Sequence, residues 1–254
     1  MPKDVAGRQP KYQRIAAALK DAIASGEYGP GDRLPGESDL MSQYGVARMT
    51  ARQAFGVLQA EGLTEARKGA GVFVREFKVV IRRRGIQRLA VEVWGAGGSI
   101  WGVDGKGRDP VVEFLGVDEG EAPGRIASAL GLAANAPACI RRRRFTLDGK
   151  PVLLATSYLD AALVAGSPIA EPDSGPGGIY ARLAELGHKP ARFREEIRSR
   201  MPGPDEAERL ALTAGTPVVL ICRTALTADA RVVEVNEMVL DASAYVLEYE
   251  FDAP

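Results

Sequence analysis

The sequence predicts an α+β protein in two parts: an N-terminal group of helices that ends in a short hairpin, and a C-terminal antiparallel sheet that carries helices. In the first 75 residues, apolar side chains recur every three to four positions, which is the spacing of amphipathic helices. Farther along, short apolar runs alternate with helical patterns, as in a sheet with helices packed against it. The chain has 254 residues, enough for about two domains.

The first helix is expected between Pro10 and Gly26, because an apolar stripe follows the proline and glycine commonly ends a helix. The stripe consists of Ile15, Leu19 and Ile23. A turn rich in glycine and proline, "EYGPGDRLP", comes next. A short second helix is then expected over "GESDLMSQYG", which ends at Gly45. Its apolar face consists of Leu40, Met41 and Tyr44.

The third helix is expected from about Ala47 to Glu61, where apolar side chains again recur at helical spacing. After it, two β-prone arms, Leu63–Arg67 and Val72–Val74, surround the tight-turn signal "KGAG". The order is therefore helix, helix, turn, helix and hairpin. This order is that of a winged helix-turn-helix domain.

One side of the third helix carries side chains that suit DNA. Arg48 and Arg52 are four residues apart and share a face, with Thr50 between them. The recognition helix of such a domain enters the major groove with its N-terminal residues first, and arginine binds guanine O6 and N7 with two hydrogen bonds. The alternative is a solvated helix face, since many helices carry two arginines at this spacing. The preceding turn and short helix, together with the glycine-tipped hairpin, favour DNA binding.

The distribution of charge along the chain is compatible with DNA binding but does not require it. Lys and Arg equal Asp and Glu at 33 each, so the net charge excludes no class of partner. Residues 1–75 hold 11 basic against 8 acidic side chains, whereas the remainder holds 22 against 25. The N-terminal part is thus slightly basic, as expected of a nucleic-acid-binding segment.

The segments "PGDRLPGESDLMSQYGVARMTARQAFGVLQAEGL" and "KGAGVFV" resemble the DNA-binding domain of GntR-type bacterial transcription regulators over about residues 11–74. The positions implied to contact DNA, with the hairpin residue Lys68, are Ser38, Ala47, Arg48, Thr50, Arg52 and Gly71. The family often has a long polar residue in place of Ser38 and serine in place of Ala47, so contacts are expected to be lost there. Glu37 matches a family glutamate, and a carboxylate there can orient a recognition arginine by a charge-assisted hydrogen bond.

The glycine-rich stretch "WGAGGSIWGVDGKGRDP" separates the two parts, and the connection is expected to begin near Glu76–Gly85. Beyond it, five alternating segments are expected to be strands of an antiparallel sheet. They are "PVVEFLGV", "ACIRRRRFTL", "PVLLATSYL", "TPVVLICRTAL" and "VVEVNEMVL". The segments expected to be helices are Gly124–Leu132, Gly177–Gly187 and Asp205–Leu212.

The C-terminal part is similar to the UTRA effector domain of the HutC subfamily over about residues 80–252. The segments that carry the resemblance are "RRRFTLDGKPVLLATSYL", "IYARLAELGHKP" and "PVVLICRTAL…VVEVNEMVLDASAYVLEYEF". It implies a fold like that of chorismate lyase, a ligand pocket and a homodimer. The expected organisation is a winged helix-turn-helix domain over 8–75, a linker over 76–88, and an effector-binding and dimerisation domain over 89–252.

The run Arg141–Arg144 is the main candidate for effector binding. On a strand, alternate residues face opposite sides, so one pair can line a pocket and bind a carboxylate, a phosphate or a sugar acid. The sequence does not decide which pair does so, and a solvated sheet edge is the alternative. Phe145 and Ala155 stand where relatives often have polar residues, which leaves a more apolar ligand, or none, open. The effector candidates are Arg142, Arg143, Arg144, Tyr158, Glu234 and Asn236.

The scarcity of histidine and cysteine, and the lack of a long apolar segment, disfavour metal-binding, catalytic and membrane functions. His188 is the single histidine, so a metal site or a Ser-His-Asp triad is not expected. Cys139 and Cys222 have no zinc-ligand spacing and are expected to be reduced and buried, and no cofactor is expected. Trp94 and Trp101 flank the glycine-rich stretch, where they either cover a pocket or pack in the core, and packing is favoured. With neither a signal segment nor an apolar run of about 18 residues, the chain is expected to be cytoplasmic, away from membranes.

The leading hypothesis is a homodimeric transcription repressor that binds a palindromic operator in double-stranded DNA and responds to a small-molecule effector. A ligand-independent repressor of a plasmid or mobile-element system is the alternative. An enzyme related to chorismate lyase is the least favoured hypothesis, because the sequence offers no pair of nucleophile and base.

Overall fold

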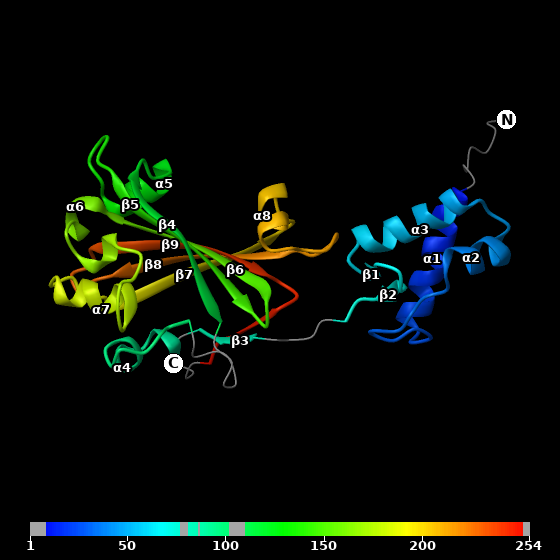
Figure 1. The fold of residues 1–254 in the computed structure, drawn as a ribbon, viewed down its shortest axis with the longest axis horizontal. Coiled ribbons are helices and arrows are strands. Elements are labelled where there is room, and N and C mark those ends of the chain that lie inside the picture. Colours follow the sequence, from blue (N-terminus) through cyan, green and yellow to red (C-terminus); the bar gives the residue numbers. More distant parts are fainter. Residues whose placement is uncertain (1–8, 77–80, 86, 102–109, 251–254) are drawn as a thin grey trace, which may run out of the picture. The chain divides into compact units, whose positions relative to one another are not determined.

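The computed structural model describes residues 9–76, 81–85, 87–101 and 110–250. The chain forms two compact units: the first comprises the residues up to 78 together with Thr213–Thr216, and the second comprises the rest. The first unit is helical and ends in a hairpin, and the second is built on a sheet (Figure 1). Together they form the α+β architecture that the sequence predicts.

Three helices form the first unit: α1 (Lys11–Ala24), α2 (Glu37–Tyr44) and α3 (Arg48–Ala60). Their inward faces make one apolar core, which includes Ile15, Leu19, Leu40, Phe55 and Leu58. Gly45 connects α2 to the turn before α3, and its φ of 58° lies in the left-handed region that glycine adopts without strain. This tight connection places α3 directly after α2, as a helix-turn-helix requires.

The hairpin consists of β1 (Thr64–Arg67) and β2 (Gly71–Val74), which pair antiparallel with Arg67 opposite Gly71. Val74 at its base belongs to the same core as the three helices. The hairpin is therefore packed into the unit at one end, while its turn at residues 68–70 is exposed.

The second unit is built on a six-stranded antiparallel sheet in the order β4-β5-β6-β9-β8-β7. The strands are β4 (Val111–Gly120), β5 (Ala138–Leu147), β6 (Lys150–Asp160), β7 (Arg192–Arg200), β8 (Val218–Leu226) and β9 (Val232–Asp241). A separate parallel pair joins β3 (Ile81–Arg84) to β10 (Tyr245–Glu248). Since β3 pairs with β10, residues 81–84 belong to this unit's structure, although the sequence assigned them to a linker.

Short helices cover both faces of the sheet. One face carries η1 (Gln87–Leu89), α4 (Val91–Trp94), α6 (Ala161–Val164), η2 (Pro168–Ala170) and α7 (Gly178–Glu185). The other carries α5 (Gly124–Leu130) and α8 (Pro204–Arg209), and Figure 1 shows α4 and α7 on the side opposite α5 and α8. The face under α4 and α7 is called the α7 face below.

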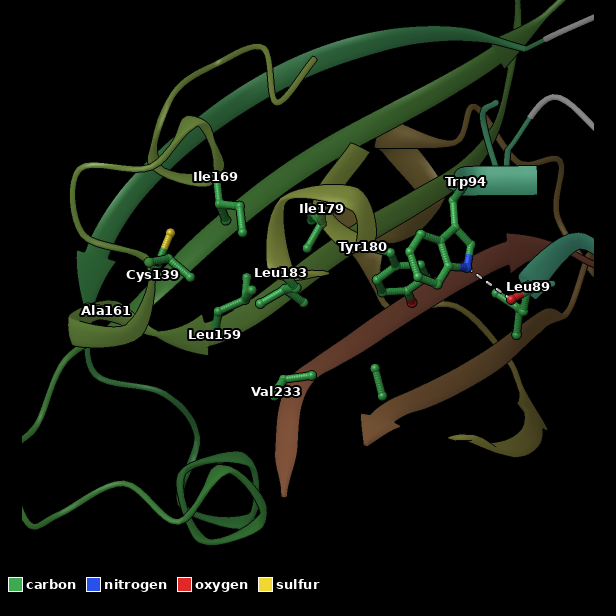
Figure 2. Packing of buried hydrophobic residues seen from close by; sticks show 12 residues of the cluster. Leu89, Trp94, Cys139, Leu159, Ala161, Ile169, Ile179, Tyr180, Leu183 and Val233 are labelled. Atoms are coloured by element: carbon green, nitrogen blue, oxygen red, sulfur yellow. Dashed lines mark hydrogen bonds between the residues drawn. The ribbon is translucent and has the colours of Figure 1, made fainter. Parts of the chain in front are cut away.

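The largest core of the second unit lies under α4 and α7. Figure 2 shows Trp94 beside Tyr180, with the indole Nε1 donating a hydrogen bond of 3.1 Å to the carbonyl oxygen of Leu89. The two rings meet edge to face at 6.1 Å between centroids. Because Trp94 satisfies its polar atom inside the core, it is a packing residue, as expected.

The sequence located most elements to within a few residues, including the three helices and hairpin of the first unit and all five expected strands. It missed three strands: β3, β7 and β10. In β7 ("RFREEIRSR"), the charged side chains hide the alternation of apolar residues by which strands are recognised. β7 lies at the sheet edge, where charged residues on both faces are tolerated. Of the two cysteines, Cys139 is buried and Cys222 half-buried, and both are free.

Candidate functional site

The first candidate site is the exposed N-terminal part of α3, where one carboxylate holds two arginines. Arg52 Nε donates to Glu37 Oε1 at 2.7 Å, and Arg48 Nε lies 3.4 Å from Glu37 Oε2. The arginine side chains are 60% and 63% exposed, whereas that of Glu37 is 30% exposed. The carboxylate thus occupies the Nε side of each guanidinium and limits the rotamers of both side chains.

Other predicted DNA-contacting residues lie around this arginine pair. Thr50 is half-buried in the first turn of α3, and Ser38 is exposed in the first turn of α2. Ala47 is the N-cap of α3, with its carbonyl accepting from Thr50 N–H at 2.9 Å, but it has no side-chain acceptor for the helix. At Ala47, the helix end therefore lacks the side-chain hydrogen bond that serine provides.

The hairpin of β1 and β2, called the wing below, carries a second set of cationic side chains. Lys68 is exposed in the turn, and Gly71 follows it with a φ of 119°. A Cβ atom on Gly71 would lie 3.0 Å from Arg33 Nε, so glycine lets the arginine lie against the hairpin backbone. Arg67 stacks over the Phe73 ring at 4.2 Å. Sequence reasoning missed Arg33 and Arg67, although their arginine identity close to the glycine-tipped turn was a usable signal.

The second candidate site is a cavity of about 360 Å³ on the α7 face of the sheet. Its floor comes from β5 and β9, and its walls from residues 97–101, from β4 and from residues 172–180. The apolar part of the lining includes Ile100, Trp101, Val112, Phe114 and Ile179. Its polar lining includes Arg141, Arg143, Glu234 and Asn236. Such a mixture of apolar walls and a few convergent polar groups is typical of small-molecule sites.

The two cavity arginines have different tasks. Arg141 donates to the backbone carbonyls of Ile169, Glu171 and Pro172, so its guanidinium fixes the segment that leads into the cavity wall. Arg143 donates from Nη2 to Ser157 Oγ at 2.6 Å and lies 5.3 Å from the Trp101 ring centroid. Burial lowers the pKa of Arg143 to about 10, which leaves it protonated at neutral pH.

Glu234 and Asn236 complete the polar part of the cavity from β9. Asn236 Nδ2 donates to Ser157 Oγ at 2.9 Å and lies 3.5 Å from Glu234 Oε1. Both side chains are almost fully buried. The Tyr180 ring also lines the cavity, and the pKa of its hydroxyl is raised by burial and by the charge of Glu234.

The other predicted effector residues lie on the opposite face of the sheet. Arg142 pairs with Asp118 and Arg144 with Glu113, and these ion pairs are partly exposed. Tyr158 packs in the cluster around α5, where burial raises the pKa of its hydroxyl. Because successive side chains on a strand alternate in direction, the prediction that Arg142 and Arg144 share a site with Arg143 does not hold for this cavity.

Phe145 and Ala155, which suggested an apolar ligand, do not line the described part of the cavity. Both are buried in an apolar cluster on the α7 face, and the Phe145 ring packs against the Trp101 ring at 4.5 Å between ring centroids. Their apolar nature therefore reflects core packing and says little about the polarity of the ligand.

A buried ion cluster beside the cavity escaped sequence analysis. Glu195 Oε1 accepts from Arg88 at 2.6 Å and from Arg223 at 2.9 Å, and lies 3.5 Å from Arg83. Burial opposes ionisation of Glu195, but the charges of Arg223, Arg88 and Arg83 outweigh it and lower its pKa to about 2. Arg223 also donates to the Tyr180 hydroxyl at 3.2 Å. These groups come from five separate segments, so no local pattern could reveal them.

Within the parts of the chain that the structure describes, no group of three or more His, Cys, Asp or Glu side chains is placed to bind a metal. None of the described helices is long and apolar enough to cross a membrane.

Comparison with known proteins assigns both units to families. The gntR family of bacterial regulatory proteins matches residues 11–74, and the UTRA domain matches residues 105–246. An uncharacterised HTH-type transcriptional regulator of Streptomyces coelicolor is 31% identical over 98% of this chain and 96% of that protein. An HTH-type transcriptional regulator of Mycobacterium tuberculosis is 32% identical over 90% and 81%, respectively. The crystal structure of PhnF from Mycobacterium smegmatis has a TM-score of 0.57 at 25% identity, covering 94% of this chain and 100% of that one.

Proposed function

We propose, from the premise that this chain belongs to the GntR family of bacterial regulatory proteins and carries a UTRA domain, that it is a homodimeric, effector-released repressor of a palindromic operator. Its function as a DNA-binding transcription regulator follows from the family. The observation that carries the proposal is the pair of exposed arginines on α3, held by Glu37.

In this proposal, Arg48 and Arg52 read base edges in the major groove, because their outer N–H groups stay exposed while Glu37 occupies Nε. Thr50 contacts a phosphate or a thymine methyl group. The exposed wing residue Lys68 binds the backbone of the same half-site. Ser38 and Ala47 are short, and they contribute fewer contacts than long side chains would.

The effector site in this proposal is the cavity lined by Arg143, Glu234 and Asn236. A ligand bound there favours one of two dimer geometries, and operator affinity changes because only one geometry fits both half-sites. A ligand-independent repressor loses its main support, since Phe145 and Ala155 are core residues. The relatives described above are named as transcription regulators, which agrees with the expectation that this chain is not an enzyme.

The operator part of the proposal is tested by protection mapping on the DNA that flanks the protein's own gene. We expect a protected site with two-fold symmetry whose half-sites face one side of the duplex, because a symmetric dimer presents two copies of α3. Sedimentation of the free protein should give the mass of a dimer. A protected site without symmetry, or a monomeric mass, would contradict the proposal.

A further inference from the structure

One large apolar side chain of the first unit lies in solvent. Met49, in the first turn of α3, is 63% exposed, and it is the only large apolar residue that is exposed in the described part of this unit. It does not belong to the apolar core that joins the three helices and the wing. The packing of the unit therefore does not explain a methionine at this position.

The position of Met49 on α3 distinguishes it from an ordinary exposed side chain. Isolated apolar residues are common on protein surfaces and by themselves indicate no function. Met49, however, follows Arg48 directly and lies three residues before Arg52, which makes it a neighbour of Arg52 on the exposed side of the helix. Glu37 holds both arginines, at 3.4 Å from Arg48 Nε and 2.7 Å from Arg52 Nε. Met49 is therefore part of the surface that, in the proposed function, enters the major groove.

A glycine on the same side of α3 indicates a partner that approaches the helix closely. Gly56 follows Met49 by about two helical turns, so the two residues lie on one line along the helix. Gly56 is exposed, and a Cβ atom there would have no neighbour within 4 Å outside the backbone of its own helix. Packing within the protein thus does not require glycine, although glycine destabilises a helix interior relative to alanine. Close approach of the helix backbone to a bound partner is a use that explains it.

The chemistry of the thioether side chain limits what Met49 can contact in DNA. It has no hydrogen-bond donor and its sulfur is only a weak acceptor, so it does not bind a phosphate or the polar edge of a base. The bases present one apolar group in the major groove, the C5 methyl group of thymine. A methionine side chain is also flexible, so that its end can follow a methyl group without strain. Thymine is therefore the base that an exposed methionine on a recognition helix suits.

We propose that Met49 is a specificity-determining residue, which packs on the C5 methyl group of one thymine in each half-site of the operator. This proposal rests on the function proposed above, in which α3 reads the major groove. It adds a base preference that Arg48 and Arg52 do not supply, because arginine hydrogen-bonds to guanine and gains nothing from a methyl group.

The test removes the methyl group from the DNA and, separately, the side chain from the protein. The duplex is the site mapped by protection or, where the flanking DNA holds none, a site that the full-length protein selects from a random pool. Each thymine is replaced in turn by deoxyuridine, which pairs as thymine does but lacks the C5 methyl group. For the wild type, we expect one replacement per half-site to weaken binding about fourfold, the loss that corresponds to one methyl-sized group withdrawn from an apolar contact.

Variants show whether Met49 contacts that methyl group. Met49→Ala should bind the unmodified duplex about fourfold more weakly, and deoxyuridine at the sensitive position should weaken it no further, because the two changes remove the same contact. Met49→Leu, which keeps an apolar side chain of similar volume, should retain the preference for thymine. Met201→Ala is the matched control, since Met201 is a methionine of the second unit that is 54% exposed, and it should respond to deoxyuridine like the wild type. Circular dichroism shows that each variant is folded.

Each result decides the proposal. Deoxyuridine that weakens the wild type and Met49→Ala equally at every position would overturn it, and so would a wild type that is insensitive at every thymine. Either result together with a symmetric footprint would leave the repressor proposal standing. A footprint without symmetry would instead contradict the homodimer, while the deoxyuridine response still reports on the contact of Met49. A wild type that prefers no sequence at all would contradict both.

Discussion

The two units of this protein use the same pairing, one glutamate shared among arginines, in opposite environments. The exposed set is Glu37 with Arg48 and Arg52, and the buried set is Glu195 with Arg83, Arg88 and Arg223. Exposed ion pairs contribute little to stability because water solvates both charges. Buried charges lose that solvation, and each needs a partner. The first arrangement therefore keeps arginines available to a partner, whereas the second fixes the fold.

The buried set connects segments that are far apart in the chain. Arg83 lies on β3, Arg88 on η1, Arg223 on β8 and Glu195 on β7. The Tyr249 hydroxyl adds a hydrogen bond of 3.0 Å to Glu195 Oε2. One carboxylate thus ties the start of the second unit to its sheet and to the segment that follows β10. The exposed set joins only α2 and α3, which the helix-turn-helix already holds together.

The largest expected effect is on the stability of the second unit. Glu195→Gln should lower its free energy of unfolding by about 3–5 kcal/mol, because the buried Arg83, Arg88 and Arg223 lose the charge of the carboxylate that they share. Urea unfolding followed by tryptophan fluorescence measures this unit alone, since Trp94 and Trp101 are the only tryptophans in the chain. The control is Glu196→Gln on the same strand, whose carboxylate is 56% exposed and should matter by less than about 1 kcal/mol. Equal effects of the two variants would refute the distinction between buried and exposed sets.

The same pairing predicts a dependence on pH. The pKa of Glu195 is lowered from 4.5 to about 2, so its ionised form is bound more tightly in the folded state. This contribution to stability is present above pH 4.5 and is lost as the pH falls toward 2. The difference in unfolding free energy between wild type and Glu195→Gln should therefore shrink over that range. A difference that stays constant down to the lowest pH would show that the charge of Glu195 is not responsible.

A smaller effect is expected for the exposed set, and it concerns DNA rather than stability. Arg52→Ala should weaken operator binding by about 1–3 kcal/mol and relax the preference at one guanine per half-site. Titrations against operators with single base changes measure both. Arg144→Ala, which removes a partly exposed arginine of the second unit, should leave operator affinity unchanged. If Arg52→Ala weakens binding to every sequence equally, the side chain contacts phosphate and does not read a base.

The next effect concerns the start of α3, which has no side-chain cap. Ala47→Ser supplies an acceptor for the N–H groups of the first turn and should stabilise the first unit by about 1 kcal/mol. Urea unfolding followed by circular dichroism measures the change, and Ala47→Val, which enlarges the side chain without adding an acceptor, is the control. A serine variant no more stable than the wild type would show that water already satisfies this helix end.

The smallest effect on stability is expected when the carboxylate of the exposed set, Glu37, is removed. Glu37→Gln should change the free energy of unfolding by no more than about 1 kcal/mol, against the larger loss for Glu195→Gln. Operator affinity should nevertheless fall, because Arg48 and Arg52 lose the carboxylate that restricts them before binding. Unchanged affinity for the operator would mean that Glu37 does not position the arginines.

The sequence by itself determined the features that depend on neighbouring residues. Apolar spacing located the three helices of the first unit, and glycines marked the turn after α2 and the tip of the wing. The polar face of α3 followed from the same periodicity, because Arg48 and Arg52 must share a side of any helix. On β5, alternation also showed that Arg141 and Arg143 face one way and Arg142 and Arg144 the other.

Only the tertiary structure decided which of those faces is buried. Arg143 donates a hydrogen bond to Ser157 and lines a cavity, whereas Arg142 forms an ion pair with the exposed Asp118. Nothing in the run "RRRR" distinguishes the two arginines. The same holds for Glu195, which lies in a strand with the composition of a solvated surface and is nevertheless the centre of a buried cluster. The physical reason is that periodicity fixes the direction of a side chain relative to its neighbours, whereas its partners and its burial come from strands and helices distant in the sequence.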